Sequence, residues 1–347
     1  VGDGSFVELE ADPANVEAGV LDDGDALGLP ATRAPNAEPG AAVVGKAEHV
    51  DQRARERRRA GAGVEAKGQR RAIGGEPADE RVPEPEHRRL VRAGASGGVG
   101  QDHLAEPGPH LDRTKWFPYM LPHWTTEARA AARYRLGDGR ITMRIEEDTP
   151  AWRPGENRVS NLETGHFAGP PGSRVGSFNL EPDWVVTTDL PTFRGYTPHF
   201  GYFETRVRAT PEVGAHTALW MVGFEEQAAG EIQCFEIHGR HIGAERSRID
   251  HGVLPWNDPS LSDERYQDWL PIDATAFHVY GIDWTPEHVD FFVDGDHVRR
   301  VEQSPQYPMQ FELGVYEVPS EVAERDTPPA YPVTCEIDWF RGYRRLD

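Results

Sequence analysis

Short runs in which apolar and polar residues alternate begin near residue 116 and continue to the C-terminus. Residues 130–136 and 140–145 form two such runs on either side of residues 137–139, whose sequence Gly-Asp-Gly is typical of a hairpin turn. In residues 203–209 the odd-numbered positions are suited to a core, and the charged residues between them are suited to water. This period of two predicts β-strands with one buried face.

Further strands are expected at residues 289–293, 311–316 and 333–343, the first of which leads into the turn sequence Asp294-Gly295. The runs between them contain no 15-residue amphipathic helical pattern. Many short strands without intervening helices favour an all-β sandwich or jelly roll.

Aromatic residues divide the chain into two parts. All 9 Trp and all 10 Tyr lie at or after Trp116, and Phe6 is the only aromatic residue before it. A segment almost without aromatic side chains buries little area, so it cannot offset the entropy of ordering. We therefore expect residues 1–113 to be largely disordered, with at most a short charged helix near 48–60, and residues 114–347 to form one β-sandwich domain. The composition of residues 1–113 also resembles GC-rich DNA translated in an unintended frame, which would make this segment a non-native extension.

The formal net charge is −21, which disfavours nucleic acid and anionic membranes as partners because their phosphates would be repelled. A neutral polysaccharide is compatible with this charge. The two cysteines, Cys234 and Cys335, show no metal-ligand spacing and are expected to be free and buried. The chain contains no run of 18 apolar residues and no recognisable signal peptide.

Residues 230–239, with the sequence Gly-Glu-Ile-Gln-Cys-Phe-Glu-Ile-His-Gly, carry the most informative chemistry. In a regular strand Glu231 and Gln233 share one face and Glu236 points to the other. A β-bulge at residues 234–235 would return Glu236 to the first face and leave Ile232, Cys234 and Ile237 in the interior. Two carboxylates on one strand face suit a retaining glycosidase, in which the carboxyl groups lie about 5–5.5 Å apart. The alternative is an ordinary amphipathic strand with two exposed glutamates.

Five segments in order extend this picture: residues 201–207 (GYFETRV), 216–221 (HTALWM), 277–286 (FHVYGIDWTP), 292–295 (FVDG) and 336–343 (EIDWFRGY), with the acidic strand between the second and the third. Together they resemble glycoside hydrolase family 16, the family of laminarinases, lichenases, agarases and carrageenases. The resemblance covers roughly residues 116–347. It implies a β-jelly-roll sandwich with a long concave substrate cleft, endo-action and retention of configuration.

The family's bulged motif is Glu-x-Asp-x-x-Glu. By resemblance, Glu231 matches its nucleophile and Glu236 its general acid/base. The central position holds Gln233 instead of Asp, which is a departure from the motif. An amide can donate a hydrogen bond to Glu231, but it cannot accept a proton or contribute charge. This difference predicts reduced activity, an altered pH optimum or no catalysis.

Several other residues are candidates for contacts with sugar. Trp256 lies in a loop-like sequence, where an exposed ring suits stacking on a pyranose, and loop packing is the alternative. His238 would share the acidic face and contact sugar or Glu236. Trp184 is a further candidate of the same kind as Trp256, with the same alternative. The resemblance adds Trp220 and His251, whose alternatives are a core and a surface position, and Asn161.

The family also offers a metal site. Many of its members hold a structural calcium with a ligand at the position of Asp338, although an exposed strand Asp is the alternative. No cofactor is required by the predicted chemistry. The expected protein is a monomer that acts outside the cell or at its surface, a location inferred from the predicted function.

The sequence thus predicts a retaining endo-β-glycanase, with β-1,3-glucan as the leading substrate. Two alternatives remain open. One is a sugar-binding jelly roll whose site has decayed at Gln233, and the other is a transglycosylase that uses the same glutamates.

Overall fold

The computed structural model describes residues 6–8, 110–225, 229–325, 327 and 329–345. The expectations for residues 48–60, and for almost all of residues 1–113, fall outside this range. The domain boundary at residue 113 therefore stays a prediction. None of the described helices is long and apolar enough to cross a membrane.

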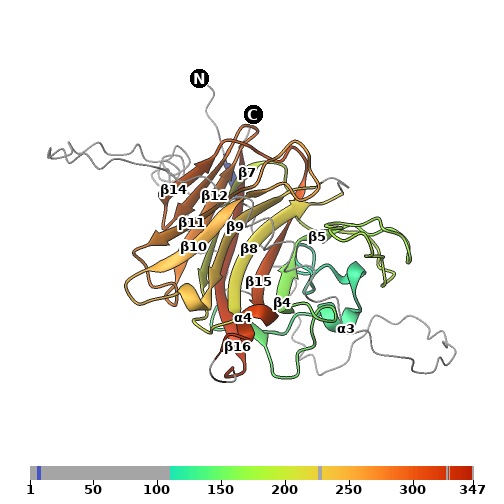
Figure 1. The fold of residues 1–347 in the computed structure, drawn as a ribbon. Helices are drawn as coiled ribbons and strands as arrows, with labels where there is room; N and C mark the ends of the chain where they lie inside the picture. The colour runs from blue at the N-terminus through green and yellow to red at the C-terminus, as the bar shows by residue number, and fades with distance from the viewer. Residues whose placement is uncertain (1–5, 9–109, 226–228, 326, 328, 346–347) are drawn as a thin grey trace, which may run out of the picture. The chain divides into compact units, whose positions relative to one another are not determined.

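Two large antiparallel sheets form the sandwich of the described residues (Figure 1). The six-stranded sheet has the order β11-β10-β9-β8-β15-β4. Its strands are β4 (Arg158–Glu163), β8 (Ala215–Gly223), β9 (Glu231–His238), β10 (Ser247–Leu254), β11 (Glu264–Leu270) and β15 (Met309–Glu317). This sheet carries the candidate site.

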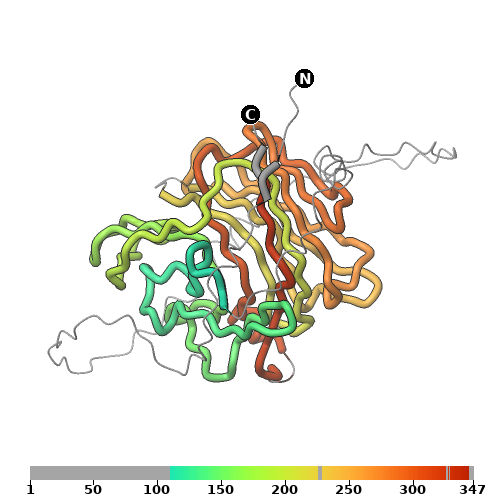
Figure 2. Tube along the Cα trace, turned by 180° about the vertical axis from the view of Figure 1, so that it is seen from behind, coloured from blue at the N-terminus to red at the C-terminus, as the bar shows by residue number. Residues whose placement is uncertain are grey.

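The eight-stranded sheet has the order β14-β13-β12-β7-β16-β3-β2, with β1 also paired to β16. Figure 2 shows the long red strand β16 in this sheet from behind. The strands of the eight-stranded sheet are β1 (Phe6–Glu8), β2 (Tyr134–Gly137), β3 (Arg140–Ile145), β7 (Gly201–Arg208), β12 (His278–Trp284), β13 (Val289–Val293), β14 (Asp296–Val301) and β16 (Val333–Arg345).

The remaining elements are short. β5 (Gly165–His166) pairs with β6 (Phe193–Arg194), and the helices are η1 (Pro122–Trp124), α3 (Glu127–Ala130), η2 (Gly239–His241) and α4 (Pro319–Val322). The all-β jelly-roll sandwich predicted from the alternating pattern is therefore confirmed.

The predicted turns have the backbone they require. Asp138 and Gly139 have φ of 53° and 70°, and Asp294 and Gly295 have φ of 51° and 80°. Two consecutive left-handed residues form the type I′ turn that matches the twist of a two-stranded hairpin. These turns join β2 to β3 and β13 to β14.

The main core lies between the two sheets and is filled by alternate residues of their strands. On β7, Phe203, Thr205 and Val207 are fully buried, while the charged residues between them are half-buried. Cys234 and Cys335 are both free and buried, as expected. The inner faces of the strands thus account for the apolar alternation of the sequence.

A second apolar cluster covers part of the six-stranded sheet from outside. We call the side of this sheet that faces away from the main core its outer face. Val159, Ala218, Trp220, Val222 and Tyr316 of β4, β8 and β15 lie on it. They pack against residues from outside the two sheets: Met120, Leu121, Trp124, Ala130, Trp152, Trp184 and Val186. We call these seven residues the covering layer.

The other half of the outer face, on β10 and β11, is more open. Arg265, Gln267 and Trp269 alternate along β11 and are exposed. They pair in register with Gly252, Asp250 and Arg248 of β10. Strand β9 therefore lies at the border between a covered and an open half.

Candidate active site

A β-bulge in β9 brings the acidic residues to one face. Against β8, Leu219 pairs with Phe235 and the next pair is Trp220 with Gln233, so Cys234 is the extra residue. The register against β10 shifts at the same place, between Asp250 and Gly252. The bulge predicted from the spacing of the glutamates is present.

The bulge sorts the side chains of β9 as expected. Ile232, Cys234, Phe235 and Ile237 belong to the main core. Side chains of a strand alternate between its two faces, so the remaining residues of β9 lie on the outer face: Glu231, Gln233, Glu236 and His238. Glu231 and Gln233 are each 6% exposed, whereas the side chain of Glu236 is 25% exposed. The two carboxylates therefore share a face and differ in their access to solvent.

Glu231 is held by an exposed tryptophan. Trp256 Nε1 donates a hydrogen bond to Glu231 Oε2 at 2.6 Å, although 43% of this tryptophan is exposed. Burial, and secondarily the charge of Glu236, raises the pKa of Glu231 to about 8, although the Trp256 hydrogen bond opposes this rise. The exposed Trp256 ring lies beside the predicted nucleophile, and its binding of sugar stays a prediction.

Glu236 has the opposite electrostatic environment. Burial alone would raise its pKa, but His238 and His216 outweigh burial and lower it to about 2. His238 Nε2 lies 3.6 Å from Glu236 Oε2. A side-chain hydrogen bond from Gln233 lowers the pKa of Glu236 further.

His238 is itself held by a second carboxylate. Its Nδ1 lies 3.0 Å from Glu321 Oε1 of α4, and Arg240 Nη2 lies 2.9 Å from the same oxygen. Burial would lower the pKa of His238, but Glu236 and Glu321 raise it to about 9. No sequence pattern pointed to Glu321, because it is 83 positions away from His238 in the chain and meets it only in the fold.

Trp220 marks the covered side of the site. It pairs with Gln233 in register, is 6% exposed and packs near Phe178, with 5.2 Å between ring centroids. Its Nε1 donates to Tyr316 Oη at 2.8 Å. Little of its surface is accessible, so it borders the site as part of the second apolar cluster.

Asn161 does not have the position expected of a sugar-binding residue. It is fully buried, its Nδ2 donates to Glu312 Oε2 and its Oδ1 accepts a hydrogen bond from Tyr316. The covering layer lies over this half of the sheet. The expectation that Asn161 contacts substrate is therefore wrong.

His251 and Trp184 are also misplaced for sugar contact. His251 points into the sandwich, stacks on Phe291 at 4.9 Å and contacts Asp268, because its position on β10 alternates with the outer face. Trp184 is buried in the covering layer, with its ring 5.5 Å from that of Trp152. Both side chains are buried, so neither is placed to contact a substrate.

Asp338, the predicted calcium ligand, lies on β16 among basic residues. Arg206 donates a hydrogen bond to one carboxylate oxygen, and Arg140 lies 3.8 Å from the other. Two guanidinium groups already balance its charge, and the described residues contain no group of three acidic, histidine or cysteine side chains placed to hold a metal. The surroundings of Asp338 do not fit a bound calcium.

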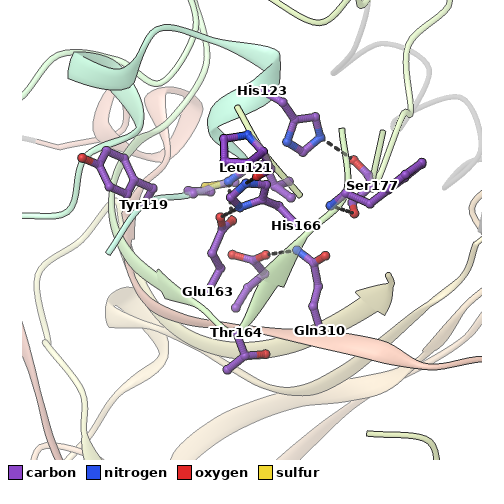
Figure 3. A network of polar contacts seen from close by, with 12 residues as sticks. Tyr119, Leu121, His123, Glu163, Thr164, His166, Ser177 and Gln310 are labelled. Atoms are coloured by element: carbon purple, nitrogen blue, oxygen red, sulfur yellow. Dashed lines mark hydrogen bonds and ion pairs between the residues drawn. The ribbon is translucent and has the colours of Figure 1, made fainter. Parts of the chain in front are cut away.

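A buried polar network lies beneath the covering layer (Figure 3). Glu163 and Glu312 are directly opposite each other on β4 and β15, and both are fully buried. Burial raises the pKa of both carboxyls well above the usual range, and repulsion between the two ionised forms adds to the rise at Glu312. Sequence reasoning missed this pair, although the polar residues Asn161 and Glu163, two positions apart on one strand face, were a signal of it.

The network reaches Trp220 through hydrogen bonds. Glu312 accepts from Gln310 at 2.8 Å and from Asn161, and Asn161 accepts from Tyr316, which in turn accepts from Trp220. The carboxylate pair is thereby linked to the border of the candidate site. We assign it a structural role beneath the covering layer.

The chain is similar in sequence to curated proteins named as glucanases. A Fibrobacter succinogenes β-glucanase is 29% identical over 156 residues, which is 42% of this chain and 43% of that protein. A Niallia circulans glucan endo-1,3-β-glucosidase A1 is 22% identical over 198 residues, which is 55% of this chain and 25% of that protein. The chain spans less than half the length of these curated relatives.

Among solved structures, a Clostridium perfringens endo-β-galactosidase that releases GlcNAcα1-4Gal aligns with a TM-score of 0.58 and 29% identity. The alignment covers 69% of this chain and 61% of that one. The model of glycosyl hydrolases family 16 matches residues 191–341, a range that contains β9 and both glutamates of the candidate site.

Proposed function

We propose that this chain is a family 16 glycoside hydrolase that cleaves a β-linked polysaccharide internally and with retention of configuration. The bulged strand β9 carries the proposal, because it gathers Glu231, Gln233 and Glu236 on the outer face at the border of its open half. The match of residues 191–341 to the family model supports it.

In the proposed mechanism Glu236 protonates the leaving oxygen while Glu231 attacks the anomeric carbon and forms a covalent glycosyl-enzyme. Glu236 then removes a proton from water, which attacks the same carbon and releases the sugar. The attack requires a charged Glu231. Because the pKa of Glu231 in the free protein is about 8, we expect kcat/KM to rise with pH up to that region.

We propose β-1,3-glucan as the leading substrate, supported by the glucanase names of the curated relatives. A β-galactoside polymer is the second candidate, because 29% identity to an endo-β-galactosidase extends over 69% of this chain. Substrates of this size are degraded outside cells, so we propose an extracellular or cell-surface location and action as a monomer.

Release of reducing ends from laminarin, lichenan, agarose and a mucin-type galactan tests the proposal. We expect release from one of these polymers and a loss of about 10³-fold or more in Glu231→Gln. Glu287→Gln, an exposed glutamate between β12 and β13, serves as the matched control and should retain activity. Polymer binding without release by the natural chain would favour the binding protein instead, and longer products would indicate transglycosylation.

Covalent trapping separates the roles of the two glutamates. A mechanism-based glycoside inhibitor followed by peptide mass spectrometry should label Glu231. Label on Glu236 would reverse the assignment, with Glu231 as the acid, an arrangement that suits the protonation of the free protein at neutral pH.

A further inference from the structure

Glu236 lies in a pair that no part of the catalytic motif describes. His238 Nε2 is 3.6 Å from Glu236 Oε2, and both side chains leave β9 on the outer face. The side chain of His238 is 15% exposed, so the imidazole is largely shielded from water. Shielding from water strengthens the electrostatic attraction between His238 and Glu236.

The far side of His238 is fixed as well. Glu321 Oε1 lies 3.0 Å from Nδ1, and Arg240 is held by Glu321 and Glu324 at 2.9 and 2.8 Å. The carboxylate charge beside Nδ1 stabilises the cationic form of the ring. In the cationic form Nε2, which lies 3.6 Å from Glu236 Oε2, carries a proton that it can give.

The position of this pair also relates to Gln233. Gln233 hydrogen-bonds Glu236 but cannot hold a proton. His238 is a titratable group beside Glu236 on the same strand, so it can hold the proton that the Gln233 amide cannot hold.

We propose that Glu236 and His238 work as one proton-holding pair, in which His238 supplies the proton that Glu236 delivers to the leaving oxygen. The inference rests on the proposed hydrolytic function. As the C–O bond breaks, the proton moves from His238 Nε2 to Glu236 and from Glu236 to the glycosidic oxygen, while Glu231 forms the new bond to carbon. Neutral His238 is left, and the proton released from water in the second step returns to it through Glu236.

Other ionisable groups surround the pair and set the pH at which it loses its proton. His238 gains its proton affinity from Glu236 and Glu321, which raise its pKa to about 9 against the opposing effect of burial. The groups that face the pair from neighbouring elements are His216 of β8, Asp250 of β10, Arg265 of β11, Tyr316 behind His216, and Arg240 and His241 of η2.

The proposal is tested by the direction in which a substitution at His238 shifts the alkaline limb of the pH profile of kcat/KM. In His238→Asn we expect the alkaline limb of kcat/KM to move down by about one pH unit or more, because Glu236 alone must then hold the proton. If Glu236 carries its own proton and His238 only lowers its pKa, removing the cation must move the same limb up. An upward shift, or a lower rate with an unchanged profile, would overturn the proposal.

Two further variants support the test. Glu321→Gln should shift the limb in the same direction by a smaller amount, because His238 keeps its contact with Glu236. His278→Asn, on β12 of the other sheet and paired with Asp294, is the matched control and should leave the profile unchanged.

A measurement that does not need turnover completes the design. The imidazole NMR signal of His238 in the full chain should show protonation up to about pH 9, and Glu236→Gln should lower this midpoint. Titration of His238 near 6.5 in the natural chain would overturn the pair while leaving the hydrolase intact. Absence of hydrolysis on every polymer, with the NMR midpoint near 9, would overturn the proposed function and with it the delivery of the proton.

Discussion

Gln233 determines how many charges the outer face of β9 carries. It stands between the two glutamates, on the same face, and hydrogen-bonds Glu236. A carboxylate at this position would add a third negative charge near two others. Like charges disfavour ionisation of their neighbours, so the charge at this residue controls the pH range of the site.

We expect Gln233→Asp to move the acidic limb of kcat/KM to higher pH by about one unit, because an added carboxylate raises the pKa of Glu231. A pH series on the active polymer measures the shift. Gln233→Asn, which is equally short but neutral, is the control. An equal shift in both variants would assign the effect to side-chain length and not to charge.

At the residue scale, the sequence predicted what depends on local spacing. The interval between Glu231 and Glu236 places them on opposite faces of a regular strand, so a shared face requires a bulge, which the structure has. The partners of these residues were not predictable. Trp256 and Glu321 meet Glu231 and His238 through loops and a short helix whose paths depend on the whole fold.

At the scale of the elements, the covered half of the outer face depends on Tyr316 of β15. Its hydroxyl accepts a hydrogen bond from Trp220 at 2.8 Å and donates one to Asn161 at 2.7 Å, so it joins three neighbouring strands. All three residues are buried. Loss of the hydroxyl would leave a donor and an acceptor without partners away from water.

Tyr316→Phe should therefore lower the free energy of unfolding by about 1–3 kcal/mol, which is the cost of an unsatisfied buried polar group. Urea denaturation measures this loss. Tyr280→Phe is a matched control, because Tyr280 is equally buried on β12 and its hydroxyl has no hydrogen-bond partner among the described residues. A loss as large in Tyr280→Phe would show that removal of a buried hydroxyl, and not the loss of its hydrogen bonds, accounts for the effect.

The strands were predictable because alternation is a local property, and the turns at residues 138–139 and 294–295 have the glycines they need. Which face of a strand is covered is not local. Asn161 alternates correctly for the outer face, yet the covering layer buries it. His251 occupies the inner face because the register of β10 against β9 sets its direction, and that register follows from the bulge.

At the scale of the whole molecule, Glu163 fastens the covering layer to the sheet (Figure 3). The Leu121 N–H donates to Glu163 Oε2 at 2.8 Å, and His166 Nδ1 lies 2.7 Å from Glu163 Oε1. His166 Nε2 lies 3.0 Å from the Pro191 carbonyl, which can only accept a hydrogen bond, so Nε2 carries the proton. Burial lowers the pKa of His166 to about 4, so the ring is neutral and Nδ1 is an acceptor. Glu163 must then be protonated and donate to it.

This protonation sets the pH dependence of stability. Burial raises the pKa of Glu163 well above its value in the unfolded chain, about 4.3. Between these two pKa values the folded state holds a proton that the unfolded state has released. The stabilisation is therefore fully present at low pH and is lost as pH rises towards the folded pKa, by at most about 1.4 kcal/mol for each pH unit.

Glu163→Gln should remove this loss. A glutamine amide can donate to His166 Nδ1 while its oxygen accepts from Leu121, so it reproduces the protonated acid without a group that ionises. We expect the variant to match the natural chain within about 1 kcal/mol near pH 5 and to exceed it in unfolding free energy near pH 8. Urea denaturation at both pH values, with Glu287→Gln as an exposed control, measures the difference. A variant that is equally less stable at both pH values would mean that Glu163 is ionised in the folded protein and that the covering layer is held by a charge.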